Sequence, residues 1–446
     1  MKNIYRFLIS LFAIASLHAF ADGEAQLWPD GSPIDSWFLA DEPLAQDDRE
    51  FRLVDNGIYP GEGVVRTREI QAVIDKAAEE GGGTVVVTPG IFKTGALFFK
   101  PGVNLRLMPG AVLQGSDDVS DYPVVETRIE GQTCLYFPAV VNADKCDGFT
   151  ITGGGSIDGN GLRAWKAFWL RRKWNKCTNK DEQRPRVLFV SNSRNVRIEG
   201  VNFQNSMFWT THFHRCDFLK ILDCRFYALS KPDHVKGPST DGIDLDACND
   251  VVVRNCWISN NDDGVCLKGG KGAFADDFNR FPGNGENNRI LVEGLVASTG
   301  THTALTLGSE NVRTSNVIFR NSTVEDCSNL LNLKMRVDTP QHYENIRVEN
   351  VNGKVRNAFL MCSPWAQFAD YEGRTHEELM SYARNVAMKN CDVECKTFFR
   401  TNSDRRYMDL EDFTFKNLDI KTADPSRHER LFNGVVFKDV RIVEKE

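Results

Sequence analysis

Several features that mark other classes of protein are missing from this 446-residue sequence. Beyond residue 21 it has no run of about 20 apolar residues, so we expect no membrane-spanning helix and no membrane anchor. Positive charge is also scarce, because 54 Lys and Arg stand against 61 Asp and Glu. A general nucleic-acid-binding protein is therefore not expected. A polyanionic substrate remains compatible with this charge, provided that cations gather at its site.

Twelve cysteines are present, but the Cys-x-x-Cys spacing of many metal sites is absent. We therefore expect no metal ion and no other cofactor. Cys224, Cys256 and Cys391 take the same place in a repeat described below, where a small buried hydrophobe would fit. Because a chain of this length does not need disulfides to fold, we expect most cysteines to be unpaired.

The one long apolar run lies at the N-terminus and is typical of a secretory signal peptide. Lys2 and Arg6 precede it, and Ala19 and Ala21 have the small side chains of a cleavage site. We expect residues 1–21 to be removed on export, which changes the formal net charge from −7 to −9 because two cations are lost. The mature protein would then be periplasmic or secreted.

The next part of the chain predicts an N-terminal extension followed by one helix. Residues 22–50 are loop-like. Residues 67–80 carry apolar side chains at helical spacing, with Thr67 as a candidate cap, and Gly81–Gly83 would end the helix. Short strands are expected at residues 84–87, 96–99 and 103–107, and no later segment predicts a long helix.

From about residue 147 one pattern recurs, in which aliphatic and polar residues alternate and the run ends at Asn, Asp or Gly. Its copies lie 22 to 40 residues apart, which is typical of one coil of a solenoid per repeat. The alternation gives each strand one buried face, and Asn at matching positions predicts stacked amide ladders. The copies begin at Val196, Leu219, Val251, Ile290, Val317, Ile346, Val386, Phe413 and Val435.

These observations predict an all-β fold, a single-stranded right-handed parallel β-helix over residues 51–446. The alternative, a β-sandwich, would show tight hairpin turns every 8–12 residues, whereas the repeat here is longer. The helix at residues 67–80 would cap the N-terminal coil, because an uncovered first coil would expose a sheet edge.

Three acidic residues are the candidates for chemistry. Asp241 lies 21 residues before the pair Asp262 and Asp263, about one coil away, so the three carboxylates should lie together. Carboxylates that lie close together repel one another, which raises the pKa of at least one of them. Hydrolysis of a glycosidic bond needs one protonated and one ionised carboxyl group. The alternative is that these acids are solvated turn residues, as Asp-Gly pairs often are.

Further candidates lie on neighbouring coils. His302 falls one coil after the acidic pair, where it could bind a carboxylate or a sugar hydroxyl. Lys334 and Arg336 alternate with Leu333 and Met335, so both cations should point outward, where they would neutralise the acids or hold a uronate carboxylate. Aromatic residues at 165–174 and around Trp209 could stack on sugars or simply pack a loop. The substrate-binding candidates are Lys334, Arg336, Ser239, Asn332, Lys268, Trp209 and His212.

From about residue 52 to 440, the chain resembles glycoside hydrolase family 28, the polygalacturonase-like pectin hydrolases. The resemblance implies a polygalacturonase-like hydrolase of pectic polysaccharides or oligosaccharides that needs no cofactor. Four motifs carry it in order: Ser239-Thr240-Asp241, Asp262-Asp263, Thr301-His302-Thr303 followed by Gly308-Ser309, and Asn332-Leu333-Lys334. Ile70–Asp75, Gly81–Val85, Gly110–Leu113 and Ile157–Gly161 are also similar to the family pattern.

By this resemblance Asp262 is the general acid. Asp241 and Asp263 would hold and activate the water, which gives inversion at the anomeric carbon. His302 would support the acid cluster, and Lys334 would bind a galacturonate carboxylate near the bond that breaks.

The motifs depart from the family pattern at three places: Ser239 replaces Asn, Thr flanks His302 in place of Gly, and Asn332 replaces Arg. Arg336 could supply the lost cation. The departures point away from ordinary endo-polygalacturonase specificity, and we expect an exo-acting galacturonidase or a hydrolase of rhamnogalacturonan fragments. Long excursions at residues 158–186, 268–287 and 362–382 would wall off one end of the groove.

Two other functions are compatible with a β-helix. A pectate lyase would use the acidic cluster as a Ca²⁺ site and need a basic residue for proton abstraction. A non-catalytic carbohydrate-binding protein would explain the fold and the aromatic residues, but not three acids one coil apart. We expect the protein to be a monomer.

Overall fold

The computed structural model describes residues 26–44, 49–228, 235–402 and 407–445. The expected signal peptide, residues 1–21, lies outside the described residues. Within these ranges no helix is long and apolar enough to cross a membrane.

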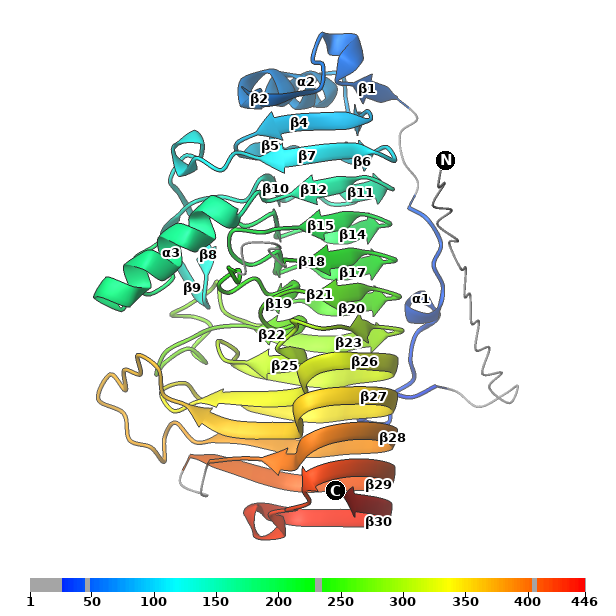
Figure 1. Ribbon diagram of the computed structural model, residues 1–446, viewed down its shortest axis with the longest axis vertical. Helices are drawn as coiled ribbons and strands as arrows, with labels where there is room; N and C mark the ends of the chain where they lie inside the picture. Colours follow the sequence, from blue (N-terminus) through cyan, green and yellow to red (C-terminus); the bar gives the residue numbers. More distant parts are fainter. Residues whose placement is uncertain (1–25, 45–48, 229–234, 403–406, 446) are drawn as a thin grey trace, which may run out of the picture.

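The chain winds into a right-handed parallel β-helix whose coils stack along the long axis of the molecule (Figure 1). Each complete coil contributes one strand to each of three columns, which we call the first, second and third columns. All three columns meet β26 (Arg313–Arg336), and the long strands β27 (His342–Trp365), β28 (Ser381–Arg400), β29 (Met408–Asp424) and β30 (Phe432–Glu444) continue the stack. The fold class predicted from the sequence is confirmed.

Before β26, the described strands of each column pair only with strands of the same column. The first column contains β1 (Glu50–Arg52), β3 (Gly83–Val87), β6 (Val103–Leu107), β11 (Thr150–Gly153), β14 (Arg194–Glu199), β17 (Asp217–Leu222), β20 (Asn249–Arg254) and β23 (Glu286–Glu293). The second contains β2 (Gly61–Val65), β4 (Gly90–Thr94), β7 (Ala111–Gly115), β12 (Ser156–Asp158), β15 (Asn202–Gln204), β18 (Arg225–Tyr227), β21 (Trp257–Ser259) and β24 (Val296–Ala297). The third contains β5 (Leu97–Phe99), β10 (Val141–Asp144), β13 (Leu188–Ser191), β16 (Thr211–His214), β19 (Ile243–Asp246), β22 (Val265–Lys268) and β25 (Thr303–Gly308).

Among the described residues, few elements lie outside the columns. The strands β8 (Val125–Ile129) and β9 (Gln132–Tyr136) form an antiparallel hairpin. The helices are α1 (Ser36–Leu39), α2 (Thr67–Glu79) and α3 (Leu162–Asn175), with short 3-10 turns η1 (Val54–Asn56), η2 (Val119–Asp121) and η3 (Glu429–Leu431).

The helix α2 covers the N-terminal coil, as predicted, and buries Ile70, Val73, Ile74 and Ala77 against it. The expectation that Thr67 caps α2 is wrong. Arg66 holds the cap position without a side-chain hydrogen bond, and the Thr67 hydroxyl instead accepts the amide of Gly95 at 2.6 Å.

The prediction that no long helix follows α2 is also wrong, because α3 spans 14 residues. Only one side of α3 is buried, by Ala164, Trp165 and Phe168. The exposed side includes Trp174, so apolar and charged residues mix around the helix and leave no clear helical period in the sequence.

The copies of the repeat predicted from the sequence are successive strands of the first column, and their equivalent positions pair with one another. Val196 pairs with Leu219, Leu219 with Val251, and Val251 with Ile290. The same row continues through Val317, Ile346, Val386, Phe413 and Val435. Each copy therefore begins at the same point of its coil, which confirms one coil per repeat.

The amide ladders are also present. The Asn350 side chain donates to Asn321 at 3.0 Å, Asn390 to Asn350 at 3.1 Å, and Asn417 to Asn390 at 2.9 Å. All four residues have φ between +51° and +55°, a left-handed conformation that Asn tolerates better than most residues. All twelve cysteines are unpaired and all but Cys134 are buried, which confirms the expectation for most of them.

The described part of the N-terminal extension, residues 26–44, runs as a strap along the first column, on the side opposite α3 (Figure 1). Its Trp28, Ile34 and Phe38 pack on a row of outward apolar residues from four consecutive coils. Arginines of the column hold its backbone: Arg254 donates to the Phe38 carbonyl at 2.6 Å, and Arg347 to the Leu27 carbonyl at 2.8 Å. The apolar row consists of Leu222, Val252, Leu291 and Ile318.

Candidate active site

A cavity of about 570 Å³ lies on the outer face of the third column. The three predicted excursions all contribute to its wall, through Asn179, Lys271 and Trp365 among others. A fourth wall was not predicted: Glu130 reaches the cavity from the turn of the β8–β9 hairpin. The cavity is therefore bounded by side chains that lie far apart in the sequence.

The acidic residues precede consecutive strands of the third column. Asp241 and Asp262 line the cavity, whereas Asp263, only 1% exposed, is buried beside them. Carboxylate oxygens of Asp241 and Asp263 lie within 4.8 Å of one another, and so do those of Asp262 and Asp263. The coils stack directly here, because the Gly242 amide donates to the Asp263 carbonyl at 3.0 Å. Gly264 follows the pair, and a Cβ there would lie 2.9 Å from the Ala304 carbonyl oxygen, so only glycine fits between the coils.

The surroundings shift the pKa values of the neighbouring Asp262 and Asp263 in opposite directions. Burial and the charge of Asp263 raise the pKa of Asp262. Burial would also raise the pKa of Asp263, but Lys334 and a hydrogen bond from His302 hold it well below its usual value. Burial and the charge of Asp262 raise the pKa of Asp241 well above its usual range. Two adjacent carboxyl groups with opposite shifts are the arrangement that acid–base catalysis requires.

His302 and Lys334 are the cations that hold Asp263 ionised. The Nδ1 of His302 lies 3.0 Å from Oδ1 of Asp263, and this hydrogen bond raises the pKa of His302. The His302 side chain is 47% exposed and lines the cavity. The Lys334 ammonium lies 3.9 Å from Oδ2 of Asp263 and 4.6 Å from the centre of the Trp365 ring.

Four of the other predicted residues, Ser239, Asn332, Lys268 and Trp209, also line the cavity. Arg336 lines it too, but Asp338 binds its guanidinium with two hydrogen bonds of 2.7 Å. With its side chain only 1% exposed, Arg336 is not a free substitute for the cation missing at position 332.

The structure does not bring His212 to this cavity, contrary to the sequence-based expectation. It is completely buried between Arg186, 2.6 Å from its Nδ1, and Asp246, 3.4 Å from its Nε2. Burial lowers the pKa of His212 to about 3. His212 thus forms part of the support of the wall, together with the buried ion pair between Arg128 of the hairpin and Asp246.

Sequence reasoning missed two acids at the centre of the site, Asp244 and Glu310. Asp244 lies three residues after Asp241, and Glu310 directly follows the Gly308-Ser309 motif. Their positions beside recognised motifs were the available signal. Glu130 offered none, because the hairpin that carries it lies outside the repeat.

Two groups of side chains have a spacing that could suit a metal ion: Asp241, Asp263 and Cys266, and Asp262, Asp263 and His302. Neither is the all-oxygen set that Ca²⁺ prefers. The ammonium groups of Lys334 and Lys268 already lie within 4 Å of these carboxylates. The donor set therefore does not fit a calcium site.

Comparisons with known proteins agree with this geometry. A family model described as glycosyl hydrolases family 28 matches residues 124–357, more than half of the chain. A probable polygalacturonase of Vitis vinifera is 24% identical over 71% of this chain and 64% of its own length. An exopolygalacturonase of Zea mays is 25% identical over 46% of each chain. The chain covers less than two thirds of the length of either relative.

Solved structures show the same fold. An exopolygalacturonase from Thermotoga maritima superposes with a TM-score of 0.70 at 22% identity, covering 90% of this chain and 92% of the other. A polygalacturonase from Erwinia carotovora gives 0.67 at 19% identity, covering 90% and 98%. The family model spans the clustered acids, His302 and Lys334, and the chain belongs to glycosyl hydrolases family 28.

Proposed function

We propose that this protein hydrolyses α-galacturonosidic bonds of pectin and releases galacturonate units from a chain end. The observation that carries the proposal is the pair Asp262 and Asp263, whose pKa values shift in opposite directions beside one cavity. Such a pair supplies an acid and a base at the same pH.

In the proposed reaction Asp262 gives its proton to the glycosidic oxygen as the bond to the anomeric carbon breaks. A water held between Asp241 and Asp263 attacks that carbon from the opposite face, and Asp263 takes the proton that the water loses. The anomeric configuration is inverted. Asp262 ends ionised and Asp263 protonated, and exchange with solvent restores both. His302 keeps Asp263 ionised before each cycle.

The charge of the cavity supports an anionic substrate. Although the whole chain has a net charge of −7, seven Lys and Arg line the cavity against four Asp and Glu. Such a local excess of cations attracts polyanions into a site. In the proposal Lys334 binds a galacturonate carboxylate. The seven cations are Arg172, Lys180, Lys268, Lys271, Lys334, Arg336 and Arg400.

The wall of the cavity supports action at a chain end. Asn179, from the segment after α3, donates to Glu130 of the hairpin at 2.8 Å. The Tyr136 hydroxyl of the same hairpin donates to the Asn179 carbonyl at 3.0 Å. The hairpin and the α3 excursion thus form one continuous barrier at the side of the cavity nearest the N-terminal coils. A polymer could not continue past such a barrier.

The experiment that tests the function is a time course of products from polygalacturonic acid and from rhamnogalacturonan I oligosaccharides, with and without chelator. We expect saturated monomeric galacturonate as the only early product, and the substrate consumed would show which polymer is trimmed. Early release of mixed oligomers would refute exo action. Unsaturated products that vanish with chelator would show a lyase instead.

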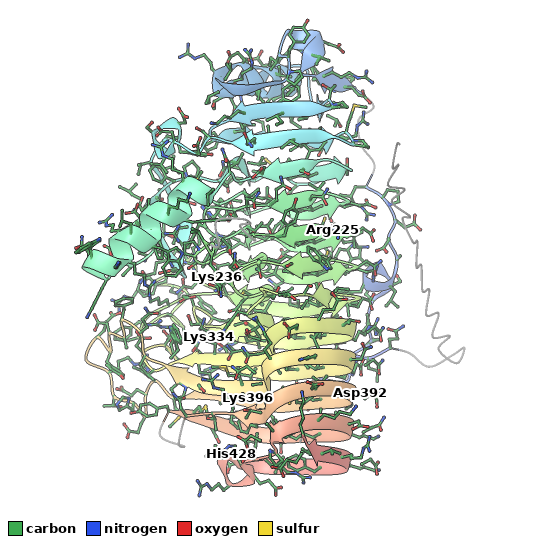
Figure 2. All side chains as sticks on the ribbon, in the orientation of Figure 1. Arg225, Lys236, Lys334, Asp392, Lys396 and His428 are labelled. Carbon is green, nitrogen blue, oxygen red and sulfur yellow. The ribbon has the colours of Figure 1, made fainter. Side chains whose placement is uncertain are left out.

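Two variants accompany this time course. Asp262→Asn should lower turnover by at least about 100-fold, because the general acid is lost, and its melting temperature should change little. The matched control is Asp392→Asn, an exposed carboxylate of β28 far from Lys334 in Figure 2, which should keep wild-type turnover. Substrate binding with no turnover by the wild type would indicate a non-catalytic carbohydrate-binding protein.

We further propose that the enzyme is exported after loss of residues 1–21 and acts as a monomer. Residues 22–50 would then form the strap-bearing extension and residues 51–446 the catalytic domain. The mass of the mature chain and its mass in solution test these two statements.

A further inference from the structure

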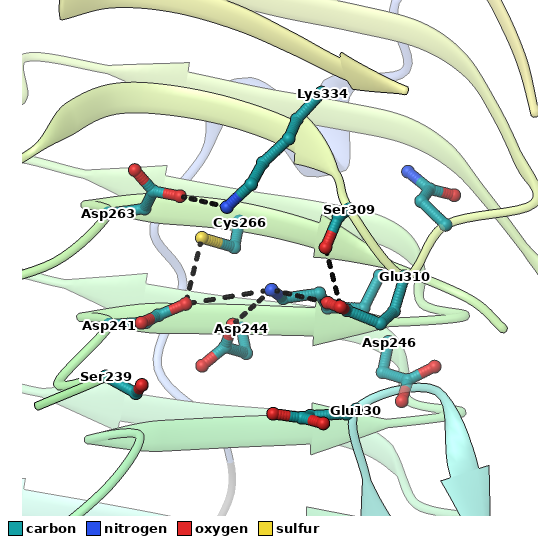
Figure 3. A network of polar contacts seen from close by, with 12 residues as sticks. Glu130, Ser239, Asp241, Asp244, Asp246, Asp263, Cys266, Ser309, Glu310 and Lys334 are labelled. Carbon is teal, nitrogen blue, oxygen red and sulfur yellow. Dashed lines mark hydrogen bonds and ion pairs between the residues drawn. The ribbon is translucent and has the colours of Figure 1, made fainter. Parts of the chain in front are cut away.

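A second cluster of charged groups lies beside the acid pair and is centred on Lys268. Its ammonium is 3.7 Å from Oδ2 of Asp241, 3.7 Å from Oδ1 of Asp244 and 3.4 Å from Oε2 of Glu310 (Figure 3). The four residues come from three consecutive coils: Asp241 just before β19 and Asp244 on it, Lys268 on β22, and Glu310 after β25. The cluster therefore links Asp241, a proposed catalytic carboxylate, to the next two coils along the chain.

The surroundings of Lys268 leave little of its ammonium group within reach of a substrate carboxylate. An ammonium group has three N–H donors, and three carboxylates surround this one at 3.4–3.7 Å. The ring of Trp209 covers it with its centre at 4.9 Å, and the side chain is only 4% exposed. These contacts favour an internal role for Lys268, and its predicted binding of substrate is the alternative that the tests below distinguish.

Three carboxylates cannot all be neutralised by one cation, so a proton must be shared among them. Asp244 has no exposed surface, and neither of its oxygens has a hydrogen-bond partner among the described residues. Burial raises the pKa of Asp244 to about 8. Glu310 accepts the Ser309 hydroxyl at 2.6 Å, and Lys268 and Arg336 overcome its burial and lower its pKa. The negative charge thus resides on Glu310, while Asp244 and Asp241 are the members of the cluster whose surroundings favour a proton.

Asp241 faces charged groups from every element around it. The Cys266 thiol donates to its Oδ2 at 3.5 Å, Asp262 and Asp263 lie on the next coil, and Lys268 is the one cation within 4 Å of it among the described residues. Burial and the charges of Asp262, Asp244 and Asp263 raise the pKa of Asp241, and Lys268 opposes them. Without Lys268 the carboxyl group would keep its proton to a still higher pH, and its protonated oxygen would be a poor acceptor for the attacking water.

We propose that Lys268 is a positioning residue, which orients Asp241 toward the attacking water and favours its ionised form, while Glu310 anchors the ammonium from the other side. The inference rests on the proposed hydrolytic function. Neutral Asp244 completes the cluster, since it takes up space beside Lys268 without competing for its charge. Lys271 and Arg336 face Glu310 and Lys334 faces Asp263, so each of the ionised acids has its own cation.

The first test is the effect of Lys268→Met and Lys268→Arg on the kinetics of galacturonate release. Asp263 ionises at a lower pH than Asp241, so the acid limb of the kcat/KM profile reports Asp241. Lys268→Met should lower kcat at least 100-fold, leave KM within threefold, and move the acid limb up by one pH unit or more. In Lys268→Arg the acid limb should lie close to its wild-type position. Lys396→Met, an exposed lysine of β28, is the control.

A second variant acts in the opposite direction. Glu310→Gln keeps the shape of the side chain and removes the competing anion, so the charge of Lys268 acts more strongly on Asp241. The acid limb should then move to lower pH. A merely structural role would lower the melting temperature in both variants and leave the limb in place. A tenfold rise in KM for Lys268→Met with an unchanged limb would show that Lys268 binds substrate, and would overturn the proposal.

Thermal unfolding gives a readout that does not depend on turnover. In Lys268→Met the native state should bind extra protons at Glu310 and Asp241, so its stability should fall as pH rises, because the unfolded state ionises these groups. The difference in melting temperature from the wild type should widen between pH 5 and pH 8. A constant difference would refute the charge arrangement. Failure of the wild type to act on any pectic substrate would refute the proposed function separately.

Discussion

Lys334→Met tests how the cavity recognises its substrate. The Lys334 ammonium lies 3.9 Å from Asp263, which is longer than the 2.7–2.9 Å of a direct charge-assisted hydrogen bond. Its side chain is 20% exposed toward the cavity, and the Trp365 ring supports it at 4.6 Å. The ammonium therefore retains N–H donors for a ligand, which distinguishes Lys334 from the enclosed Lys268.

The size of the effect follows from the contact that is removed. A hydrogen bond between charged partners contributes about 1.5–3 kcal/mol. At about 1.4 kcal/mol for each factor of ten, the variant should lose about 10- to 150-fold in kcat/KM on digalacturonate. Met fills the volume of the lysine stem, so the loss should come from the charge and not from a cavity. Because Lys334 also lowers the pKa of Asp262, the alkaline limb of the rate profile should move to higher pH.

The assay compares digalacturonate with its methyl diester, which has the same shape and no negative charge. The kcat/KM for the diester should fall much less, because an uncharged ester forms no ion pair with Lys334. The matched control is Lys396→Met, which removes an exposed lysine from β28 outside the cavity lining. An equal loss on both substrates would show that Lys334 acts through Asp263 and does not bind a carboxylate, and would refute the reasoning.

Three further predictions test other parts of the molecule. The rate should fall as pH rises through the raised pKa of Asp262, because the protonated acid is the active form; a rate that keeps rising to pH 9 would exclude that role. Asp246→Asn removes the partner of buried Arg128, which should lower the free energy of unfolding by about 3–5 kcal/mol and loosen the β8–β9 hairpin. Calorimetry should then show a lower melting temperature, and chromatography should show mixed oligomeric products. Phe38→Ala should cost about 3–5 kcal/mol locally and speed proteolysis within residues 26–44 while turnover stays unchanged; unaltered protection would show that the strap does not depend on this side chain.

The sequence predicted the repeating part of the fold well because a parallel β-helix repeats the same physical environment on each coil. An aliphatic residue such as Val251 occupies the same inward position as Leu219 before it and Ile290 after it. The hydrophobic pattern therefore records the register directly. The same logic placed Asp241 beside Asp262 and Asp263, since residues one coil apart must stack in space.

The excursions could not be predicted in the same way, because each occurs once and has no neighbouring copy to compare with. The helix α3 is packed by Trp165 and Phe168 on one side and presents charged residues on the other, without a regular apolar stripe. The β8–β9 hairpin is held by a buried ion pair between Arg128 and Asp246, 118 residues apart. Contacts at such separations leave no local pattern in the sequence.

The misplacement of His212 has a physical cause that also bears on specificity. Position within a coil determines which way a side chain points, but the excursions determine what covers it. His212, Asp244, Cys266, Thr306 and Asn332 form one outward row across the third column, each paired with the next. At the N-terminal end of this row Arg186, which also binds the β8–β9 hairpin, covers His212. At the other end Asn332 lines the cavity. Shortening a wall would expose more of the row and lengthen the groove, without altering the register that holds the acids together.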